Sequence, residues 1–169
     1  MTPINQGNNL IQVDILAVVK GQRLLAIDYG ERFLGVAVSD IMWHLSTPLF
    51  PIDSKSCNAF QALGSLIDQH ACGGIVVGYP LNMNGSEGAA CQKVLEFCEK
   101  LRKFFPNIPI GLFDERLSTV AADNAMIEGD LSRKKRKQKV DSLAASYILQ
   151  NTLDYLRNKV TATIVGTNS

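Results

Sequence analysis

Two apolar segments joined by only four residues place the strongest constraint on how this chain can fold. The first covers residues 23–28 and ends in a carboxylate, Asp28; the second covers residues 33–40, where apolar side chains form a nearly continuous run. The connection Tyr29–Arg32 is short and contains a glycine, which is typical of a β-hairpin. The two segments are therefore predicted to be neighbouring antiparallel strands.

The rest of the chain alternates between strand and helix patterns. Residues 74–78 form an apolar run without polar alternation, as expected for a parallel strand covered on both faces. Two further strands are predicted at residues 49–52 and 110–113. Helices are predicted from a cap at Ser54 or Ser56 to about His70, and at residues 86–104, 118–128 and 140–156. Three antiparallel strands followed by alternating helices and strands indicate an α/β fold with one mixed sheet flanked by helices.

A length of 169 residues with 46% hydrophobic residues suits one domain with a sizeable core. We expect this domain over residues 23–157, after a flexible N-terminal extension (1–22) and before a C-terminal tail (158–169). No apolar run approaches the roughly 20 residues of a membrane span, and residues 10–19 are not preceded by the basic region of a secretory signal. A cytoplasmic location without membrane contact is therefore expected.

The four cysteines disfavour a zinc site, because they form no C-x-x-C pair and the chain has only two histidines. Cys91 and Cys98 are seven residues apart and share a helical stripe with Val94 and Leu101. This pattern predicts buried, reduced thiols rather than a disulfide or a catalytic cysteine.

The net charge of +1 hides a strong local asymmetry. Residues 132–139 hold six of the 17 basic side chains and no acid, so the rest of the chain has 11 basic and 16 acidic residues, a net charge of −5. The six are Arg133, Lys134, Lys135, Arg136, Lys137 and Lys139. Such a run is usually a solvated, mobile loop, but its position just before Asp141 favours capture of a nucleic-acid backbone.

Carboxylates stand where several predicted elements begin or end. Asp28 closes the first strand, Asp114 and Glu115 close the fifth, and Asp141 opens the last helix, on a stripe with Ala145. Strand ends are where sites form in open α/β sheets. Converging acids without a nearby histidine or thiol suit Mg²⁺ or Mn²⁺, and two such ions about 4 Å apart can support phosphodiester hydrolysis.

Each of these acids also has a purely structural interpretation. Asp141 is favourable at a helix N-terminus through the helix dipole alone. Asp114 could begin a turn, and Glu115 could form a surface ion pair with Arg116. The joint placement of the acids, rather than any one of them, favours a site.

The same segments carry a family resemblance. They are Ala26–Gly30 (AIDYG), Gly35–Asp40 (GVAVSD), Val77–Gly85 (VGYPLNMNG), Asp114–Thr119 (DERLST) and Lys134–Arg136 leading to Val140–Ala145 (VDSLAA). Ordered motifs at suitable spacing are far more specific than a single glycine-rich match. Over residues 23–157 the chain closely resembles the YqgF family, also called RuvX, of the ribonuclease H-like superfamily.

The resemblance implies a ribonuclease H-like fold with a five-stranded mixed sheet in the order 3-2-1-4-5, strand 2 being antiparallel. It also implies a metal-dependent nuclease that uses Mg²⁺ or Mn²⁺ and processes the 5′ end of precursor 16S rRNA. By motif, Asp28 is the first metal ligand, Glu115 the second and Asp141 the third. RuvC-type resolvases place an acid at the end of the fourth strand, where this chain has Gly78. Glu115 must therefore reach in from the neighbouring strand.

Several further residues are candidates for contact with nucleic acid. Asn82 and Asn84 precede a predicted helix whose free N–H groups suit a phosphate, although they could equally be plain caps. Arg116 could orient Glu115 or contact a phosphate, and Arg133, Lys134, Lys135, Arg136 and Lys137 could neutralise a backbone. Trp43 and Tyr79 could stack on unpaired bases or simply complete a core.

Three functional hypotheses follow. The first is a nuclease acting on structured or precursor RNA, with branched DNA as the second substrate. The second is a nucleic-acid-binding accessory protein without catalysis, in transcription or ribosome assembly. The third is an ATPase of the actin or sugar-kinase type, which the chain disfavours because those enzymes bind nucleotide between two domains. A homodimer is compatible with all three.

Overall fold

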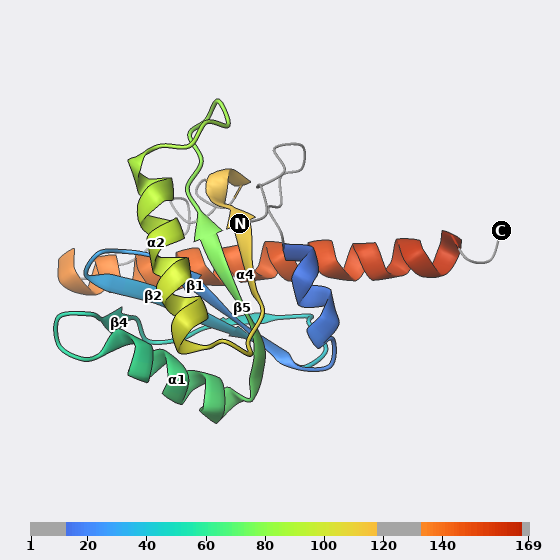
Figure 1. Cartoon of the computed structure of the whole chain (residues 1–169), viewed down its shortest axis with the longest axis horizontal. Helices are drawn as coiled ribbons and strands as arrows, with labels where there is room; N and C mark the ends of the chain where they lie inside the picture. Colours follow the sequence, from blue (N-terminus) through green and yellow to red (C-terminus); the bar gives the residue numbers. More distant parts are fainter. Residues whose placement is uncertain (1–12, 118–132, 167–169) are drawn as a thin grey trace.

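The computed structural model describes residues 13–117 and 133–166, and within these ranges it describes the side chains of residues 13–116 and 142–159. One mixed sheet forms the centre of the molecule, with helices on both faces (Figure 1). Its strands are β1 (Arg23–Asp28), β2 (Phe33–Ser39), β3 (Ser46–Pro48), β4 (Ile52–Asp53), β5 (Cys72–Tyr79) and β6 (Ile110–Asp114).

The strand order is β3-β2-β1-β5-β6, with β4 also paired to β2. β1 and β2 are antiparallel, whereas β1–β5 and β5–β6 are parallel. This confirms the hairpin and the ribonuclease H-like order 3-2-1-4-5.

The third strand of that order is divided into two short pieces. We expected one strand at residues 49–52; instead β3 ends at Pro48 and β4 begins at Ile52. Proline at positions 48 and 51 removes two backbone N–H groups, so a continuous ladder cannot form across this stretch.

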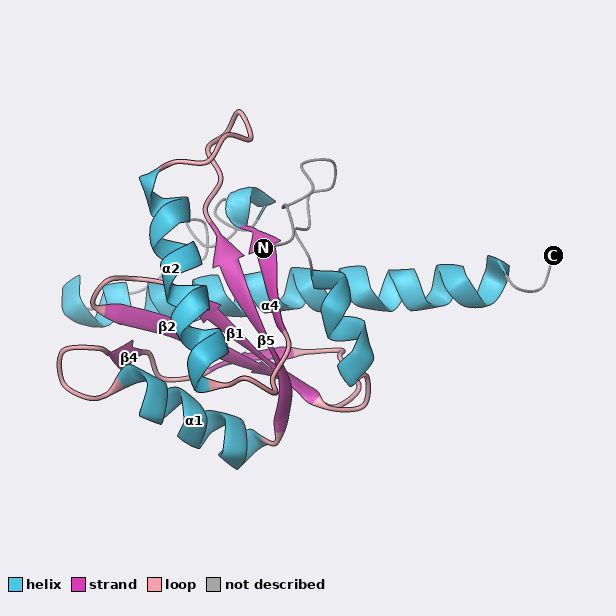
Figure 2. Cartoon of the chain, viewed as in Figure 1, coloured by secondary structure: helices cyan, strands magenta, loops and turns pink. Residues whose placement is uncertain are grey.

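Helices cover both faces of the sheet (Figure 2). Helices α1 (Ala59–His70) and α2 (Ala89–Phe104) pack on one face, where Leu63 and Leu101 join a core with Leu25. Helix α4 (Arg133–Gly166) and the 3-10 helix η1 (Val13–Val19) pack on the other. Adjacent residues of a strand point to opposite faces, and β5 is buried on both sides, as predicted for residues 74–78.

Several helix boundaries differ from the predicted ones. α1 is capped by Asn58, whose Oδ1 accepts hydrogen bonds from the N–H groups of Phe60 (3.1 Å) and Gln61 (3.3 Å), and not by Ser54 or Ser56. α2 begins at Ala89, three residues later than expected. The helix predicted at residues 118–128 lies outside the described residues.

The largest difference concerns the basic segment. We expected a mobile loop before a helix starting near Val140, but α4 already begins at Arg133 and continues to Gly166. The basic residues 133–139 therefore belong to the helix backbone, and most of the expected tail is helical. The C-terminal turns of α4 extend past the sheet (Figure 1).

Part of the expected flexible extension is packed against the sheet. Val13 and Leu16 of η1 are fully buried in the α4-side core. Glycines make this contact feasible: a Cβ at Gly74 would lie 3.0 Å from Leu16 Cδ2, and a Cβ at Gly111 would lie 3.0 Å from Val13 Cα.

Burial shows the roles of the cysteines and of the tryptophan. Cys91 and Cys98 are buried free thiols, as predicted, and burial raises the pKa of Cys98 to about 12. Trp43 is 3% exposed and its Nε1–H donates to the carbonyl of Gln22 (2.7 Å), so it completes the core and is not a stacking platform.

Among the described residues, no helix combines the length and the hydropathy needed to cross a bilayer.

Candidate active site

The candidate site lies where β1, β5 and β6 end. Ile27 pairs with Val77, and Tyr79 pairs with Asp114, so the three parallel strands end at one edge of the sheet. Asp28 is the last residue of β1, and Glu115 follows β6 as the first residue of the 3-10 helix η2 (Glu115–Leu117). Both carboxylates are half-buried. Rigid strands therefore hold two acids that are far apart in the sequence at one edge.

Glu115 occupies the space above Gly78. A Cβ built on Gly78 would overlap Oε1 of Glu115 and would lie 2.9 Å from its Cδ. Gly78 belongs to β5, which lies between β1 and β6. The absence of a side chain on the middle strand thus lets Glu115 extend across it toward Asp28, the reach suggested by the sequence.

The electrostatic state of Glu115 reflects this position. Burial is the main cause that raises the pKa of Glu115, to about 8; the charge of Asp28, a hydrogen bond with Asp28 and the charge of Asp114 raise it further. Near neutral pH, Glu115 therefore keeps its proton and remains hydrogen-bonded to Asp28. A hard divalent cation offers an alternative to this proton, because it neutralises both carboxylates through oxygen ligands.

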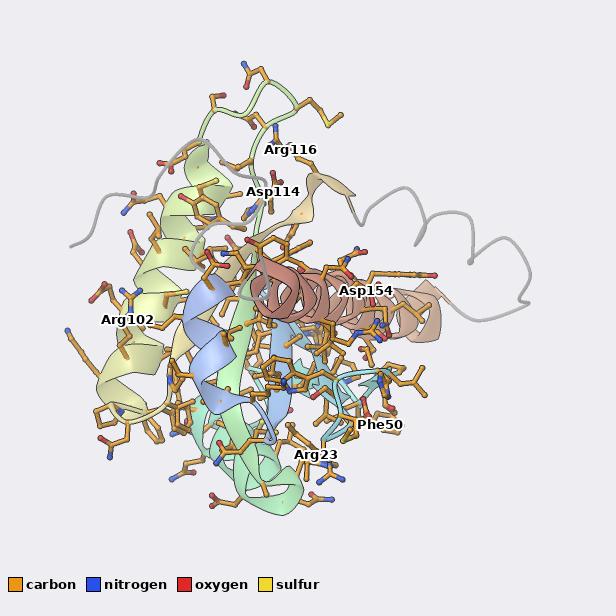
Figure 3. All side chains as sticks on the ribbon, turned by 90° about the vertical axis from the view of Figure 1, so that its right-hand side faces the viewer. Arg23, Phe50, Arg102, Asp114, Arg116 and Asp154 are labelled. Atoms are coloured by element: carbon orange, nitrogen blue, oxygen red, sulfur yellow. The ribbon has the colours of Figure 1, made fainter. Side chains whose placement is uncertain are left out.

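Arg116 binds Asp114 rather than Glu115. Its Nε donates to Oδ1 (3.0 Å) and Oδ2 (2.9 Å) of Asp114, and its Nη2 donates to Oδ2 (2.5 Å). Asp114 is 1% exposed, so this fork neutralises a buried charge. The ion pair that Arg116 forms is therefore with Asp114, and not the surface pair with Glu115 that was one alternative. Figure 3 shows Asp114 and Arg116 together at one end of the sheet.

The loop after β5 is closed by its own polar groups. The amide of Asn82 donates to Ser86 Oγ (2.9 Å), while Oδ1 of Asn84 accepts from the N–H (3.0 Å) and Oγ (2.6 Å) of Ser86. Gly85 turns the chain with φ +83°, and a Cβ there would lie 3.4 Å from Arg116 Nη1. Asn82 and Asn84 thus shape an exposed loop over Arg116 and do not cap α2, which has Gly88 as its N-cap.

The structure describes the side chain of Tyr79 but not that of Asp141. Tyr79 is fully buried, its hydroxyl has no hydrogen-bond partner among the described residues, and burial raises its pKa, so it is not available to stack on a base. Asp141 belongs to α4, but its side chain lies outside the described ones, as do those of Arg133, Lys134, Lys135, Arg136 and Lys137. Just after Asp141, Ser142 Oγ donates to the carbonyl of Leu49 (2.7 Å) and anchors α4 against the β3–β4 connection.

The oxygen donors fit a hard cation. Among the described side chains, no three His, Cys, Asp or Glu residues gather closely enough to hold a metal ion. Asp28 and Glu115 provide two neighbouring carboxylates, which is the donor type that Mg²⁺ and Mn²⁺ prefer. Ile148, further along α4, would lie 2.7 Å from a Cβ on Gly78, so this helix passes directly beside the paired acids.

Sequence reasoning identified both acids but missed two features of the site. It did not assign Arg116 to Asp114, although a bidentate Arg–Asp pair two residues apart needs only a tight turn. It also treated the glycine at position 78 as a departure, without recognising that the missing side chain makes the space for Glu115.

The chain is similar to several known proteins. A protein of Roseobacter denitrificans named "Putative pre-16S rRNA nuclease" is 43% identical over 147 residues, which cover 85% of this chain and 90% of that protein. A protein of Clostridium botulinum with the same name is 44% identical over 135 residues, covering 79% of this chain and 98% of that one. Among solved structures, Thermus thermophilus RuvC in complex with a Holliday junction substrate matches 82% of this chain, with 13% identity and a TM-score of 0.49.

The family model "RuvX: Holliday junction resolvase" matches residues 22–155, a span that contains β1 to β6 and residues 133–155 of α4. With relatives above 40% identical along most of both chains, this protein belongs to the RuvX Holliday junction resolvase family.

Proposed function

We propose that this protein is a metal-dependent nuclease that hydrolyses phosphodiester bonds in the precursor of 16S rRNA. The observation that carries the proposal is the position of Glu115, whose carboxylate lies above Gly78 and is hydrogen-bonded to Asp28. Two adjacent carboxylates at the ends of rigid parallel strands form a site for hard cations. The relatives' names supply the substrate class.

In this proposal Asp28, Glu115 and Asp141 provide the oxygen ligands. Mg²⁺ or Mn²⁺ bound there would activate a water and neutralise charge on the phosphate, in one- or two-ion form. Arg116, held by Asp114, keeps its fork beside the acids, and its Nη1 side faces the loop that contains Asn82 and Asn84.

Other parts of the chain would collect the substrate. The basic side chains on the first turns of α4, Arg133, Lys134, Lys135, Arg136 and Lys137, would neutralise backbone phosphates and make binding salt-dependent. The nuclease unit is residues 23–157, with 1–22 and 158–169 as accessory segments. It would work in the cytoplasm, either as a monomer or as a homodimer.

The test compares three labelled substrates: precursor 16S rRNA, single-stranded RNA and a four-way DNA junction, each with Mg²⁺ or Mn²⁺. We expect cleavage of the precursor by the wild type, and no cleavage but retained binding by Asp28→Asn, because only the ligand charge is removed. Asp68→Asn, on an exposed position of α1, is the matched control and should cleave normally. Cleavage that survives in Asp28→Asn rejects the metal site.

The same experiment separates the alternatives. Cleavage of the junction alone would favour a DNA resolvase, the activity in the name of the matching family model. Binding without cleavage under either metal, lost when residues 133–137 are replaced by serine, would favour an accessory protein.

A further inference from the structure

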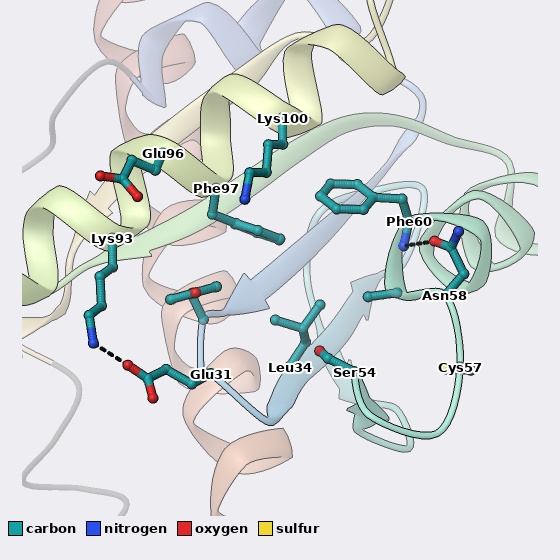
Figure 4. Close-up of a pocket in the computed structure, with 13 residues that line it drawn as sticks. Glu31, Leu34, Ser54, Cys57, Asn58, Phe60, Lys93, Glu96, Phe97 and Lys100 are labelled. Carbon is teal, nitrogen blue, oxygen red and sulfur yellow. Dashed lines mark hydrogen bonds and ion pairs between the residues drawn. The ribbon is translucent and has the colours of Figure 1, made fainter.

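A concave site lies beside the β1–β2 turn, on the face of the sheet that α1 and α2 cover. It is a cavity of about 330 Å³ between the β1–β2 turn, the start of α1 and one side of α2 (Figure 4). This volume is at the lower end of the range for small-ligand pockets, which is about 300–1,000 Å³. The cavity can therefore admit one small planar group but not a nucleic-acid duplex.

Aromatic rings form one wall of the cavity. The ring centroid of Phe97 lies 4.8 Å from that of Tyr29 and 5.8 Å from that of Phe60, and all three residues line the cavity. Tyr29 and Phe60 are only partly buried. The wall thus offers ring surface that the core does not use completely, the kind of platform on which nucleobases stack.

Polar residues complete the lining. Ser54 lies beside Leu34, and Asn58 lies beside Phe60 at the start of α1. The Oδ1 of Asn58 is engaged in capping α1, whereas its amide group has no hydrogen-bond partner among the described residues. A hydroxyl and an amide next to aromatic rings can recognise the edge of a base.

Lysines on α2 line the rim. Lys93 and Lys100 are seven residues apart and so face the same side of the helix. Lys93 forms an ion pair with Glu31. None of the ion pairs among the described residues involves Lys100, so this ammonium is available to a phosphate. Glu96 also lines the rim, so the cavity as a whole is not an anion site, and the base must contribute to recognition.

The cavity adjoins the candidate active site through the chain itself. Tyr29 and Gly30 line it and directly follow Asp28. Three residues of chain span at most about 11 Å, so the rim at Glu31 lies near the end of β1 that carries Asp28. Asp28 shares the α4 face of the sheet with Ala26, whereas the cavity opens on the α1 and α2 face, so one nucleic-acid strand would reach both by passing around the end of β1.

We propose that this cavity binds a single unpaired nucleotide of the RNA strand on which the nuclease acts, with the base on the aromatic wall and its phosphate near Lys100. The inference rests on the proposed function, since that function supplies the strand. In addition, the enzyme would recognise an unpaired base near the cleavage position. A strand with a flipped-out or single-stranded nucleotide is therefore favoured over a continuous duplex.

Cys57 provides a direct probe of occupancy. It lines the cavity and is exposed, whereas the other three cysteines are buried. In EDTA, a short single-stranded oligoribonucleotide at about ten times its dissociation constant should slow alkylation of Cys57 about tenfold. The same sequence as a duplex, and inorganic phosphate alone, should leave the rate unchanged. Peptide mapping by mass spectrometry gives the rate.

Two variants, with one control variant, test whether the oligonucleotide binds in the cavity. Lys100→Ser should lower the slope of log affinity against log salt by about 0.7, the value for one phosphate contact on a single strand. Lys103→Ser, an exposed lysine of the same helix outside the cavity, is the control and should leave the slope unchanged. Phe60→Leu, which keeps an apolar side chain, should weaken binding at least about fivefold through lost stacking.

The inference is overturned if the oligonucleotide does not bind, if it binds by fluorescence anisotropy while Cys57 reacts at its free rate, or if duplex or phosphate protects equally well. Because binding is measured in EDTA, protection can be observed even when no substrate is cleaved. Failure of the proposed nuclease function is therefore distinguishable from failure of the nucleotide site.

Discussion

Gly78 is the residue on which the geometry of the acidic site depends. Any side chain there would meet Glu115 on one side and Ile148 on the other. Glu115 can therefore pair with Asp28 only because the strand between them has no Cβ at this position. At the same edge, Asp114 is neutralised by the planar fork of Arg116, a contact that a lysine could not make with two oxygens.

Gly78→Ala should therefore displace the Glu115 carboxylate and impair cleavage while Asp28 is unchanged. A misplacement of about 1 Å in a catalytic group can cost about 100-fold in rate, and we expect a loss of that order. Single-turnover cleavage of precursor rRNA measures it. Gly64→Ala in α1 is the control, because a Cβ there makes ordinary contact with Phe105 at 3.5 Å. Equal rates for both variants would contradict this role of Gly78.

At the scale of the elements, helix caps and prolines set boundaries that hydrophobic periodicity could not predict. Amphipathic spacing located α1 and α2 but placed their starts several residues too early, because Ser54, Ser56 and Ser86 are all acceptable cap residues. The edge strand was misplaced because Pro48 and Pro51 divide it. In α4 the basic residues continue the helix, although a run of like charge usually favours a loop.

The cap of α1 can be tested by three substitutions. Asn58→Ala should lower the free energy of unfolding by about 1 kcal/mol, because it leaves the N–H groups of Phe60 and Gln61 without their acceptor. Ser54→Ala and Ser56→Ala should change it by less than about 0.5 kcal/mol. Urea denaturation provides the measurement, and a larger loss in either serine variant would show that the cap is misassigned.

At the scale of the whole molecule, two cores hold one sheet, and the site lies at the end of the strands between them. α1 and α2 cover one core, while α4 and η1 cover the other. The burial that raises the pKa of Glu115 comes from this packing. The stability of the molecule therefore depends on the ionisation of its site.

Global stability should fall as the pH rises from about 5 to 8 in the absence of divalent cations. The folded protein keeps the Glu115 proton up to about pH 8, whereas the unfolded chain loses it near the ordinary value of 4.5, so the unfolded state binds fewer protons in this range. Thermal unfolding in EDTA tests this, and Glu115→Gln should flatten the dependence. Glu96→Gln, an exposed position, should leave it unchanged. A dependence that is identical in Glu115→Gln would refute the assignment.

The sequence by itself determined the positions and directions of the main strands, the hairpin, the family and the acids at the strand ends. These properties are local: turn length, apolar patterning and short motifs are set by residues close together in the chain. Only the tertiary structure decided that Glu115 reaches Asp28 over Gly78, that Arg116 holds Asp114, that η1 is packed, and that a cavity opens beside Tyr29. Those outcomes depend on the space left between side chains from different strands and helices, and no local sequence pattern specifies that space.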